Sequence, residues 1–220
     1  MERVLLFDLD GTLSDSATGI LGSLEMAFAD HGVEWLDATA ARAILGPPFR
    51  ASLAPHMPAE KIEPVIETYR RYYNDLEGMF NTTLYDGMGE AVAELHAAGF
   101  TLAVATSKPE QPAAAILGYL GLASFFTEIT GDTHDGVLGT KALVVGEALR
   151  RLGYPASQRV VMIGDRLHDV EGALANNVPC IGVEWGYGGF EELNAAGAAS
   201  IVAKPSELTN AIARHFEARQ

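Results

Sequence analysis

The chain has 220 residues, of which 48% are hydrophobic, and its formal net charge is −14. This length accommodates one large domain or a domain with an insertion, and the hydrophobic content is ample for a buried core. An acidic surface without a Lys/Arg cluster repels nucleic acids and anionic lipids, so a nucleic-acid polymer is not an expected partner. A small anionic ligand is compatible with this charge, because a metal ion and a few cations can reverse the potential inside a cleft.

The sequence also indicates a cytoplasmic protein. Cys180 is the single cysteine, has no partner for an intrachain disulfide, and is expected to pack in the core. The apolar run at residues 4–7 is shorter than the ~7–15 residues of a signal-peptide core. No stretch reaches the ~18 apolar residues of a membrane span. We therefore expect no membrane association, and a monomer or a homodimer.

Apolar periodicity predicts one strand near the N-terminus, followed by helices alone. Residues 4–7 form a continuous apolar run before the turn at Gly11, which is typical of a buried strand. No strand pattern is found between about residues 16 and 85. Helices are predicted there at 17–31, 37–44, 51–53 and 59–74, separated by Gly32, by the turn Gly46-Pro47-Pro48, and by Pro55 and Pro58.

From residue 86 onward, helix and strand patterns alternate. Strands are predicted at 101–106, 127–130, 159–163, 180–183 and 200–202, and helices at 89–98, 111–120, 141–152, 170–176, 190–196 and 207–219. Apolar strands alternating with helices predict a three-layer α/β/α, Rossmann-like parallel sheet covered on both faces. Ligands bind such sheets beyond the carboxyl ends of the strands. Asp8, Thr106 and Asp165 all fall at such ends.

The most informative motif directly follows the first strand. Asp8 and Asp10 are two positions apart, so they project to the same side where the strand ends. One carboxylate can then attack while its neighbour exchanges protons. Gly11 allows a sharp backbone turn, and the Thr12 hydroxyl can bond to its own main chain. A strand that ends in an Asx turn is the alternative interpretation.

Four ordered segments resemble the haloacid dehalogenase-like hydrolase superfamily, in particular its phosphoglycolate-phosphatase-like branch with a helical cap. They are Asp-Leu-Asp-Gly-Thr-Leu at 8–13, Ala-Val-Ala-Thr-Ser-Lys-Pro at 103–109, Lys141, and Gly-Asp-Arg-Leu-His-Asp at 164–169. Together they frame almost the entire chain. The resemblance implies a hydrolase core formed by residues 1–15 and 86–220, with residues 16–85 inserted as a helical cap.

Further acidic residues predict a Mg²⁺ site. A phosphate monoester dianion ~4 Å from a carboxylate is repelled by on the order of 4 kcal/mol at an effective dielectric of ~20, so countercharge is required. Asp165 and Asp169 follow an apolar strand and can supply oxygen ligands, with Asp8 and the main-chain carbonyl of Asp10 completing the set. The resemblance implies that Asp165 is the direct ligand and that Asp169 lies further from the ion. Alternatively, Asp169 only favours the start of the next helix.

Four other positions are candidates for binding phosphate or the rest of the substrate. Lys141 begins a predicted helix, where a cation is disfavoured, so an anion is expected nearby unless this is an exposed surface lysine. In the family, a lysine here bridges the nucleophile and the phosphate. Strand alternation favours a Thr106 hydroxyl and a Ser107 amide as phosphoryl donors, and a register shift would exchange them. Lys108 could contact the cap or the substrate, although a lysine before proline is more often solvated.

These features predict a Mg²⁺-dependent phosphatase acting on a small phosphate monoester. Asp8 would attack phosphorus to give an aspartyl-phosphate. Asp10 would protonate the departing alkoxide and then take a proton from the hydrolytic water. Arg50, in the cap, could bind a second anionic group of the substrate, or could be a surface arginine packed on Phe49.

The resemblance favours phosphoglycolate as the substrate, but residues 164–166 and 185–188 also resemble relatives that act on nucleoside 5′-monophosphates. A sugar phosphomutase would use the same acidic pair but protect its phospho-aspartate from water. A hydrolytic dehalogenase is disfavoured by Asp10 and the implied Mg²⁺ site. A phosphonate hydrolase would need a Schiff-base lysine in the cap, where the one lysine, Lys61, lies in a solvent-facing pattern. A binding module without activity is disfavoured because the acidic residues and Lys141 are intact.

Overall fold

The computed structural model describes residues 3–47, 49–133, 138–153 and 159–217. Pro48 of the predicted turn, residues 134–136 before Lys141 and residues 218–219 of the last predicted helix lie outside the described residues. The chain divides into two compact units, one formed by Met1–Asp15 with Leu84–Gln220 and the other by Ser16–Thr83. Within the described residues, no helix combines the length and apolar character needed to cross a bilayer.

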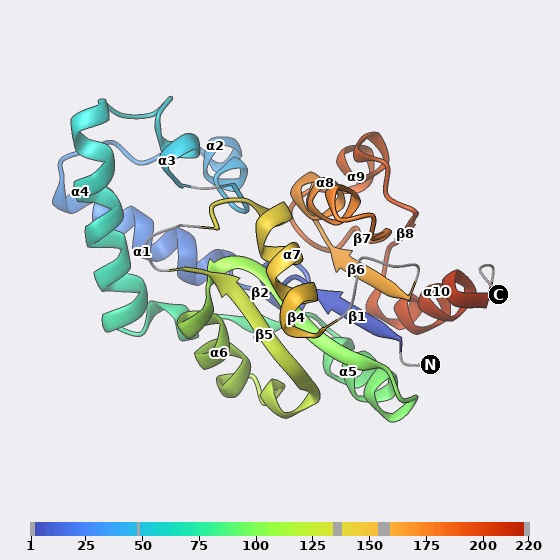
Figure 1. The fold of residues 1–220 in the computed structure, drawn as a ribbon. Helices are drawn as coiled ribbons and strands as arrows, with labels where there is room; N and C mark the ends of the chain where they lie inside the picture. The colour runs from blue at the N-terminus through green and yellow to red at the C-terminus, as the bar shows by residue number, and fades with distance from the viewer. Residues whose placement is uncertain (1–2, 48, 134–137, 154–158, 218–220) are drawn as a thin grey trace. The chain divides into compact units, whose positions relative to one another are not determined.

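The first unit contains a six-stranded sheet with the order β5-β4-β1-β6-β7-β8. Its strands are β1 (Val4–Phe7), β4 (Thr101–Pro109), β5 (Phe126–Asp132), β6 (Val160–Gly164), β7 (Cys180–Val183) and β8 (Ser200–Val202). All neighbouring pairs are parallel, and β1 lies between β4 and β6 (Figure 1). The sheet confirms the predicted fold class, and the acidic motif therefore follows a central strand.

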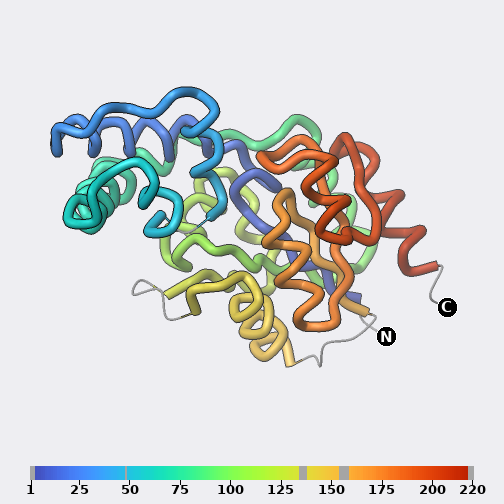
Figure 2. The backbone as a smooth tube through the Cα atoms, turned by 90° about the horizontal axis from the view of Figure 1, so that it is seen from above, coloured from blue at the N-terminus to red at the C-terminus, as the bar shows by residue number. Residues whose placement is uncertain are grey.

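Helices cover both faces of this sheet. They are α5 (Met88–Ala97), α6 (Glu110–Tyr119), α7 (Lys141–Arg151), α8 (Leu167–Ala175), α9 (Phe190–Ala196) and α10 (Pro205–Glu217). Figures 1 and 2 show α7 and α8 on one side of the strands and α5 on the other. Right-handed crossovers explain why the helices divide between the two faces of the sheet. The chain moves from β1 outward to β5 and then returns across the sheet to β8, and reversing the direction places the crossover helices on the opposite face.

Burial on both faces accounts for the apolar strands. Val4 and Leu6 belong to the core cluster that also contains apolar residues of α7 and α8. The alternate residues Leu5 and Phe7 are equally buried, with 0% exposure. A strand covered on both faces has no solvent side on which polar residues would alternate.

The second unit is helical. It contains α1 (Ala17–Asp30), α2 (Ala38–Ala43), α3 (Phe49–Leu53), α4 (Ala59–Arg70), a π-helical turn at Arg71–Asp75 and a 3₁₀ turn at Gly78–Phe80. The Asp37 side chain caps α2 by accepting from the backbone N–H groups of Thr39 and Ala40, both at 2.9 Å. Lys61 donates to the His31 carbonyl at 2.9 Å, so its ammonium is engaged at the end of α1.

The prediction that residues 16–85 hold helices alone is wrong at one point. The two-residue strand β3 (Thr83–Leu84) lies inside this segment, and the equally short β2 (Ser14–Asp15) lies directly before it. Two residues are too short to carry an alternating pattern, so no sequence signal marks them. Another difference is that α8 begins at Leu167 rather than at residue 170, because the Asp169 side chain accepts from the Arg166 N–H and caps the helix.

Gly19→Ala is expected to destabilise the helical unit. A Cβ at Gly19 of α1 would lie 2.5 Å from the Gly78 carbonyl oxygen, so α1 and the 3₁₀ turn would have to separate. Overpacking of this kind costs ~1–3 kcal/mol. The free energy of unfolding can be measured with urea and circular dichroism.

Gly22→Ala is the matched control in the same helix. A Cβ at Gly22 would have nothing within 4 Å, so alanine should stabilise α1 by up to ~1 kcal/mol. Equal stability of the two variants would show that close approach at Gly19 does not limit packing in this unit.

Candidate active site

The site is built around the buried pair Asp8 and Lys141. Asp8 directly follows β1, where its backbone N–H donates to the Ile163 carbonyl at 2.9 Å and extends the sheet ladder. Asp8 is 8% exposed, and its Oδ1 lies 2.7 Å from Lys141 Nζ. Lys141 is the first residue of α7 and is also buried. The sequence expectation of an anion near this lysine is met by carboxylates of the protein itself.

The Lys141 ammonium has three partners. Besides Asp8, it lies 2.7 Å from Asp169 Oδ1 and donates to the Ala105 carbonyl at 3.1 Å. Burial alone would lower the pKa of Lys141, but the charges of Asp169 and Asp8 outweigh this effect and raise it above the ordinary value. Lys141 is therefore a fixed cation that joins β1, β4 and α8.

Asp165 is held by two donors from distant parts of the first unit. It follows β6 and is completely buried. Its Oδ1 accepts from the Thr12 hydroxyl at 3.1 Å, and its Oδ2 accepts from the Tyr187 backbone N–H at 2.7 Å. The Trp185 indole N–H donates to the Thr12 carbonyl at 3.0 Å and so ties the two donor segments together.

Glycines make room for this carboxylate. A Cβ at Gly11, where φ is +87°, would lie 2.3 Å from Asp165 Oδ2. A Cβ at Gly186 would lie 2.3 Å from Asp165 Cβ. Any side chain at either position would displace the aspartate. The loop that contains Gly186 therefore packs directly against Asp165.

Asp169 combines a structural role with a place in the site. It is the third residue of α8, and its Oδ2 accepts from the Arg166 N–H at 3.0 Å. Its other oxygen pairs with Lys141. A Cβ at Gly164 would lie 2.3 Å from Asp169 Cβ, so a glycine at the end of β6 is required here. The helix-capping alternative from the sequence is therefore correct, but it does not describe everything this residue does.

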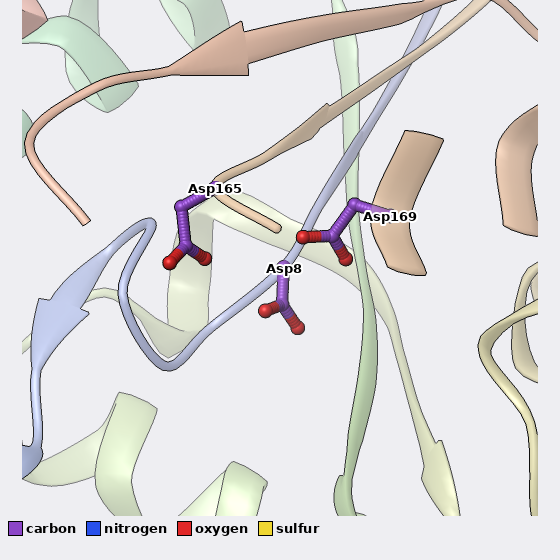
Figure 3. A group of neighbouring side chains, drawn as sticks. All are labelled: Asp8, Asp165 and Asp169. Atoms are coloured by element: carbon purple, nitrogen blue, oxygen red, sulfur yellow. The ribbon is translucent and has the colours of Figure 1, made fainter. Parts of the chain in front are cut away.

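Asp8, Asp165 and Asp169 form one acidic group. Each offers an oxygen within 4.8 Å of the others, and Figure 3 shows their carboxylates gathered from two strand ends and from α8. Burial raises the pKa of Asp8 and Lys141 lowers it, while Asp169 and Asp10 raise it further, with a result of about 6. Burial and the neighbouring aspartates also raise the pKa of Asp165 well above its usual range. This crowding of buried carboxylates is a situation that a divalent cation relieves.

Lys108 and Asp10 form a second ion pair. Lys108 Nζ lies 3.1 Å from Asp10 Oδ2, and the side chains are 6% and 19% exposed. The expectation that Lys108 is solvated is therefore wrong. Thr106, at 1% exposure, accepts from the Lys108 N–H at 3.3 Å through its hydroxyl, while Ser107 is exposed. The Thr106 hydroxyl keeps its own proton for donation.

The donor set suits Mg²⁺. Asp8, Asp10, Asp165 and Asp169 provide four carboxylates against the two ammonium groups of the ion pairs, an excess of two negative charges. Mg²⁺ prefers oxygen ligands and carries the matching charge. The residues present therefore fit the ion that the sequence predicts.

Arg50 is not among the residues that the first unit brings together. It belongs to the second unit, where its Nη2 donates to Glu63 Oε2 at 3.0 Å and its Nε also pairs with this carboxylate. Both side chains are more than half exposed. Neither alternative from the sequence, a substrate anion or packing on Phe49, included this partner.

Several contributors were not identified from the sequence. The Thr12 hydroxyl was assigned to its own loop, whereas it donates to Asp165. Gly172 was not singled out, although a Cβ there would lie 2.7 Å from Lys141 Cγ. A glycine inside a predicted helix is the signal that could have indicated close packing at this point.

Known proteins share both the sequence and the fold. The model of the family described as haloacid dehalogenase-like hydrolase matches residues 5–183. The tyrosine-protein kinase PtkA of Mycobacterium tuberculosis is 41% identical over 186 residues, which is 84% of this chain and 63% of that protein. The chain thus spans less than two thirds of the length of this relative.

Two other relatives are matched over most of their length. A 5′-nucleotidase of Pseudomonas aeruginosa is 34% identical over 87% of this chain and 86% of its own. A phosphoglycolate phosphatase of Agrobacterium fabrum is 34% identical over 85% and 82%. The crystal structure of a predicted phosphatase from Clostridium acetobutylicum superposes with a TM-score of 0.90 at 39% identity, covering 97% of this chain and 99% of that one. The chain belongs to the haloacid dehalogenase-like hydrolase family.

Proposed function

We propose that the protein is a Mg²⁺-dependent phosphatase that hydrolyses a small phosphate monoester through an aspartyl-phosphate on Asp8. The observation that carries this proposal is the buried Asp8 carboxylate, paired with Lys141 at 2.7 Å and grouped with Asp165 and Asp169. A nucleophile beside a fixed cation and a cation-binding acidic group is the arrangement that attack on a phosphate dianion requires. Family membership supports the same chemistry.

The residues of the site have two tasks: some would bind the metal ion, and others would bind the phosphoryl group. Asp8, Asp165 and the Asp10 carbonyl would hold Mg²⁺, with Asp169 further away. When bound, the ion supplies positive charge that offsets the repulsion between substrate and nucleophile. Lys141 stays protonated and stabilises both Asp8 and the transferred group. The Thr106 hydroxyl and the Ser107 backbone N–H donate to the phosphoryl oxygens.

The reaction proceeds in two displacements. An Asp8 oxygen forms a bond to phosphorus while the bond from phosphorus to the leaving oxygen breaks. Asp10 gives its proton to the departing alkoxide. Water then attacks the phosphorus of the aspartyl-phosphate and loses a proton to Asp10, and the bond between phosphorus and Asp8 breaks. The products are the alcohol and inorganic phosphate, and the enzyme again has a free Asp8 carboxylate and a protonated Asp10.

Phosphoglycolate is the first substrate that we propose, in line with the relative that bears the name phosphoglycolate phosphatase. Arg50 remains the candidate for the substrate carboxylate. Its pair with Glu63 is more than half exposed, so exchange of one carboxylate for another has a low cost. A nucleoside 5′-monophosphate is the second candidate, supported by the similarity to a 5′-nucleotidase over most of both chains.

Two alternative reactions would give products other than inorganic phosphate. A sugar phosphomutase would move the phosphoryl group between positions of a sugar without releasing phosphate. Transfer to a tyrosine hydroxyl, suggested by the similarity to PtkA, would give phosphotyrosine instead. Product analysis therefore separates hydrolysis from both transfers.

Phosphate release with Mg²⁺ should be measured across phosphoglycolate, sugar phosphates, nucleoside monophosphates and pyrophosphate. We expect phosphate release from phosphoglycolate or from a nucleoside monophosphate. Asp8→Asn should lower the rate of release at least ~10³-fold, because the nucleophile is removed. Protein tyrosine and ATP form a further arm that detects transfer. Release by Asp8→Asn at the wild-type rate would contradict the covalent mechanism.

Mg²⁺ should raise the thermal unfolding midpoint more at about pH 7.5 than at about pH 5. The pKa of Asp8 is raised from 3.8 to about 6, so between these values the folded protein retains a proton that the unfolded chain has lost. The stabilisation from this proton disappears as the pH rises through about 6. Above that pH the ionised carboxylate is available to the cation, and each kcal/mol gained should shift the midpoint by ~2–4 °C.

Asp165→Asn is the control for this measurement, together with NaCl at matched ionic strength. The variant removes one negative charge from the acidic group, so it should abolish most of the rise in the unfolding midpoint that Mg²⁺ causes. A shift of the same size at both pH values, or in Asp165→Asn, would show that the ion acts elsewhere on this acidic chain.

A further inference from the structure

We infer that Lys108 is a positioning residue for Asp10: its ammonium group holds this carboxylate in one orientation for proton exchange in the reaction. This inference rests on the proposed function, because it assigns a role within the phosphatase mechanism. The Nζ atom of Lys108 lies 3.1 Å from Asp10 Oδ2. Among the residues that the structure describes, none forms a hydrogen bond with the buried Asp10 Oδ1, so the ion pair with Lys108 is what orients this carboxylate.

The geometry requires a second cation for Asp10. An ammonium group has three N–H donors. Lys141 directs its group at Asp8, Asp169 and the Ala105 carbonyl, so all three are committed. Asp10 therefore cannot share this lysine without displacing one of its partners. A carboxylate that is largely shielded from solvent is costly without a countercharge, and Lys108 supplies that charge.

The local backbone is shaped to deliver Lys108 to this position. The pairing between β4 and β5 shifts register between Ala105 and Pro109, so the strand is irregular where Lys108 lies. The Thr106 hydroxyl accepts from the Lys108 N–H and fixes this irregular segment. A Cβ at Gly131 of β5 would lie 2.5 Å from the Lys108 carbonyl oxygen, so the neighbouring strand can approach only because it has glycine there.

The low exposure of both side chains lets the ion pair fix the orientation of Asp10. Lys108 is 6% exposed in its side chain and Asp10 is 19% exposed, so neither is free to sample many rotamers. With Oδ2 held by the lysine, rotation of the carboxylate is restricted and the group keeps a defined orientation. A displacement of a proton-transfer group by about 1 Å can cost ~10²-fold in rate. The orientation of Asp10 is thus worth a rate effect of this order.

The test compares Lys108→Met, which keeps the length of the chain, with Lys108→Arg, which keeps the charge. The two substrates are the best alkyl phosphate from the substrate panel and p-nitrophenyl phosphate, whose leaving group departs without a proton. The value of kcat/KM reports the step in which the leaving group departs. For Lys108→Met we expect a loss of ~10–100-fold with the alkyl phosphate and of less than ~3-fold with p-nitrophenyl phosphate.

Two further measurements separate positioning from substrate binding. KM and the inhibition constant of inorganic phosphate should change by less than ~3-fold in Lys108→Met, and Lys108→Arg should recover most of kcat. In an Asp10→Asn background, Lys108→Met should add little, because the group that it positions is already gone. Equal losses on both substrates, a raised KM, or additive losses in the double variant would overturn the inference and assign Lys108 to the substrate.

Wild-type protein and Asp8→Asn run in parallel distinguish the two levels of failure. If wild-type protein releases phosphate, Asp8→Asn does not, and Lys108→Met retains full kcat/KM on the alkyl phosphate, then the inference fails and the proposed function stands. If wild-type protein releases phosphate from no substrate, the proposed function itself fails. Should Lys108→Met not fold, Lys108→Gln provides the same comparison with a polar side chain, and loss of folding in both would overturn a purely positioning role.

Discussion

The buried ammonium of Lys141 is the contact on which the rest of the site depends. It touches two carboxylates and one carbonyl, which come from the end of β1, from α8 and from β4. Removing it would leave Asp8 and Asp169 buried and close to each other without a countercharge, a change that typically costs several kcal/mol. The same contact that assembles the carboxyl ends of the strands also favours the charged form of Asp8, the nucleophile that we propose. Stability and reactivity are therefore linked at one residue.

Close approach is the second constraint, and glycine satisfies it. Gly11 and Gly186 enclose Asp165, Gly164 makes room for Asp169, and Gly172 lets α8 approach Lys141. At each position a Cβ would lie under 3.0 Å from an atom of an acidic residue or of the lysine. The carboxylates can lie this close together because the residues packed against them are glycines, which have no side chain. Replacing any of these glycines by a larger residue would displace a charged side chain of the site, and would affect the strands of the sheet less.

The sequence was sufficient where a feature has a local signal. Strand and helix periodicity identified all six strands of the sheet, because strands buried on both faces leave continuous apolar runs. A cation at a helix start predicted an anion near Lys141, and the family resemblance implied that Asp8 lies beside this lysine. The Thr12 bond to Asp165 joins residues 153 positions apart, and nothing local marks it. The burial of Lys108 depends on a register shift between β4 and β5, which a single strand cannot reveal.

The two lysines pair unequally with Asp8 and Asp10, and this difference matches the tasks that we propose for the two carboxylates. Asp8 shares Lys141 with Asp169 and lies inside the acidic group, so its charge is balanced fully only when a cation joins that group. Asp10 has the Lys108 cation beside it and lies outside the group. A nucleophile gains from a countercharge that arrives together with the phosphate, since both neutralise the same repulsion. A proton carrier works in both displacements and gains more from a partner that stays in place throughout the cycle.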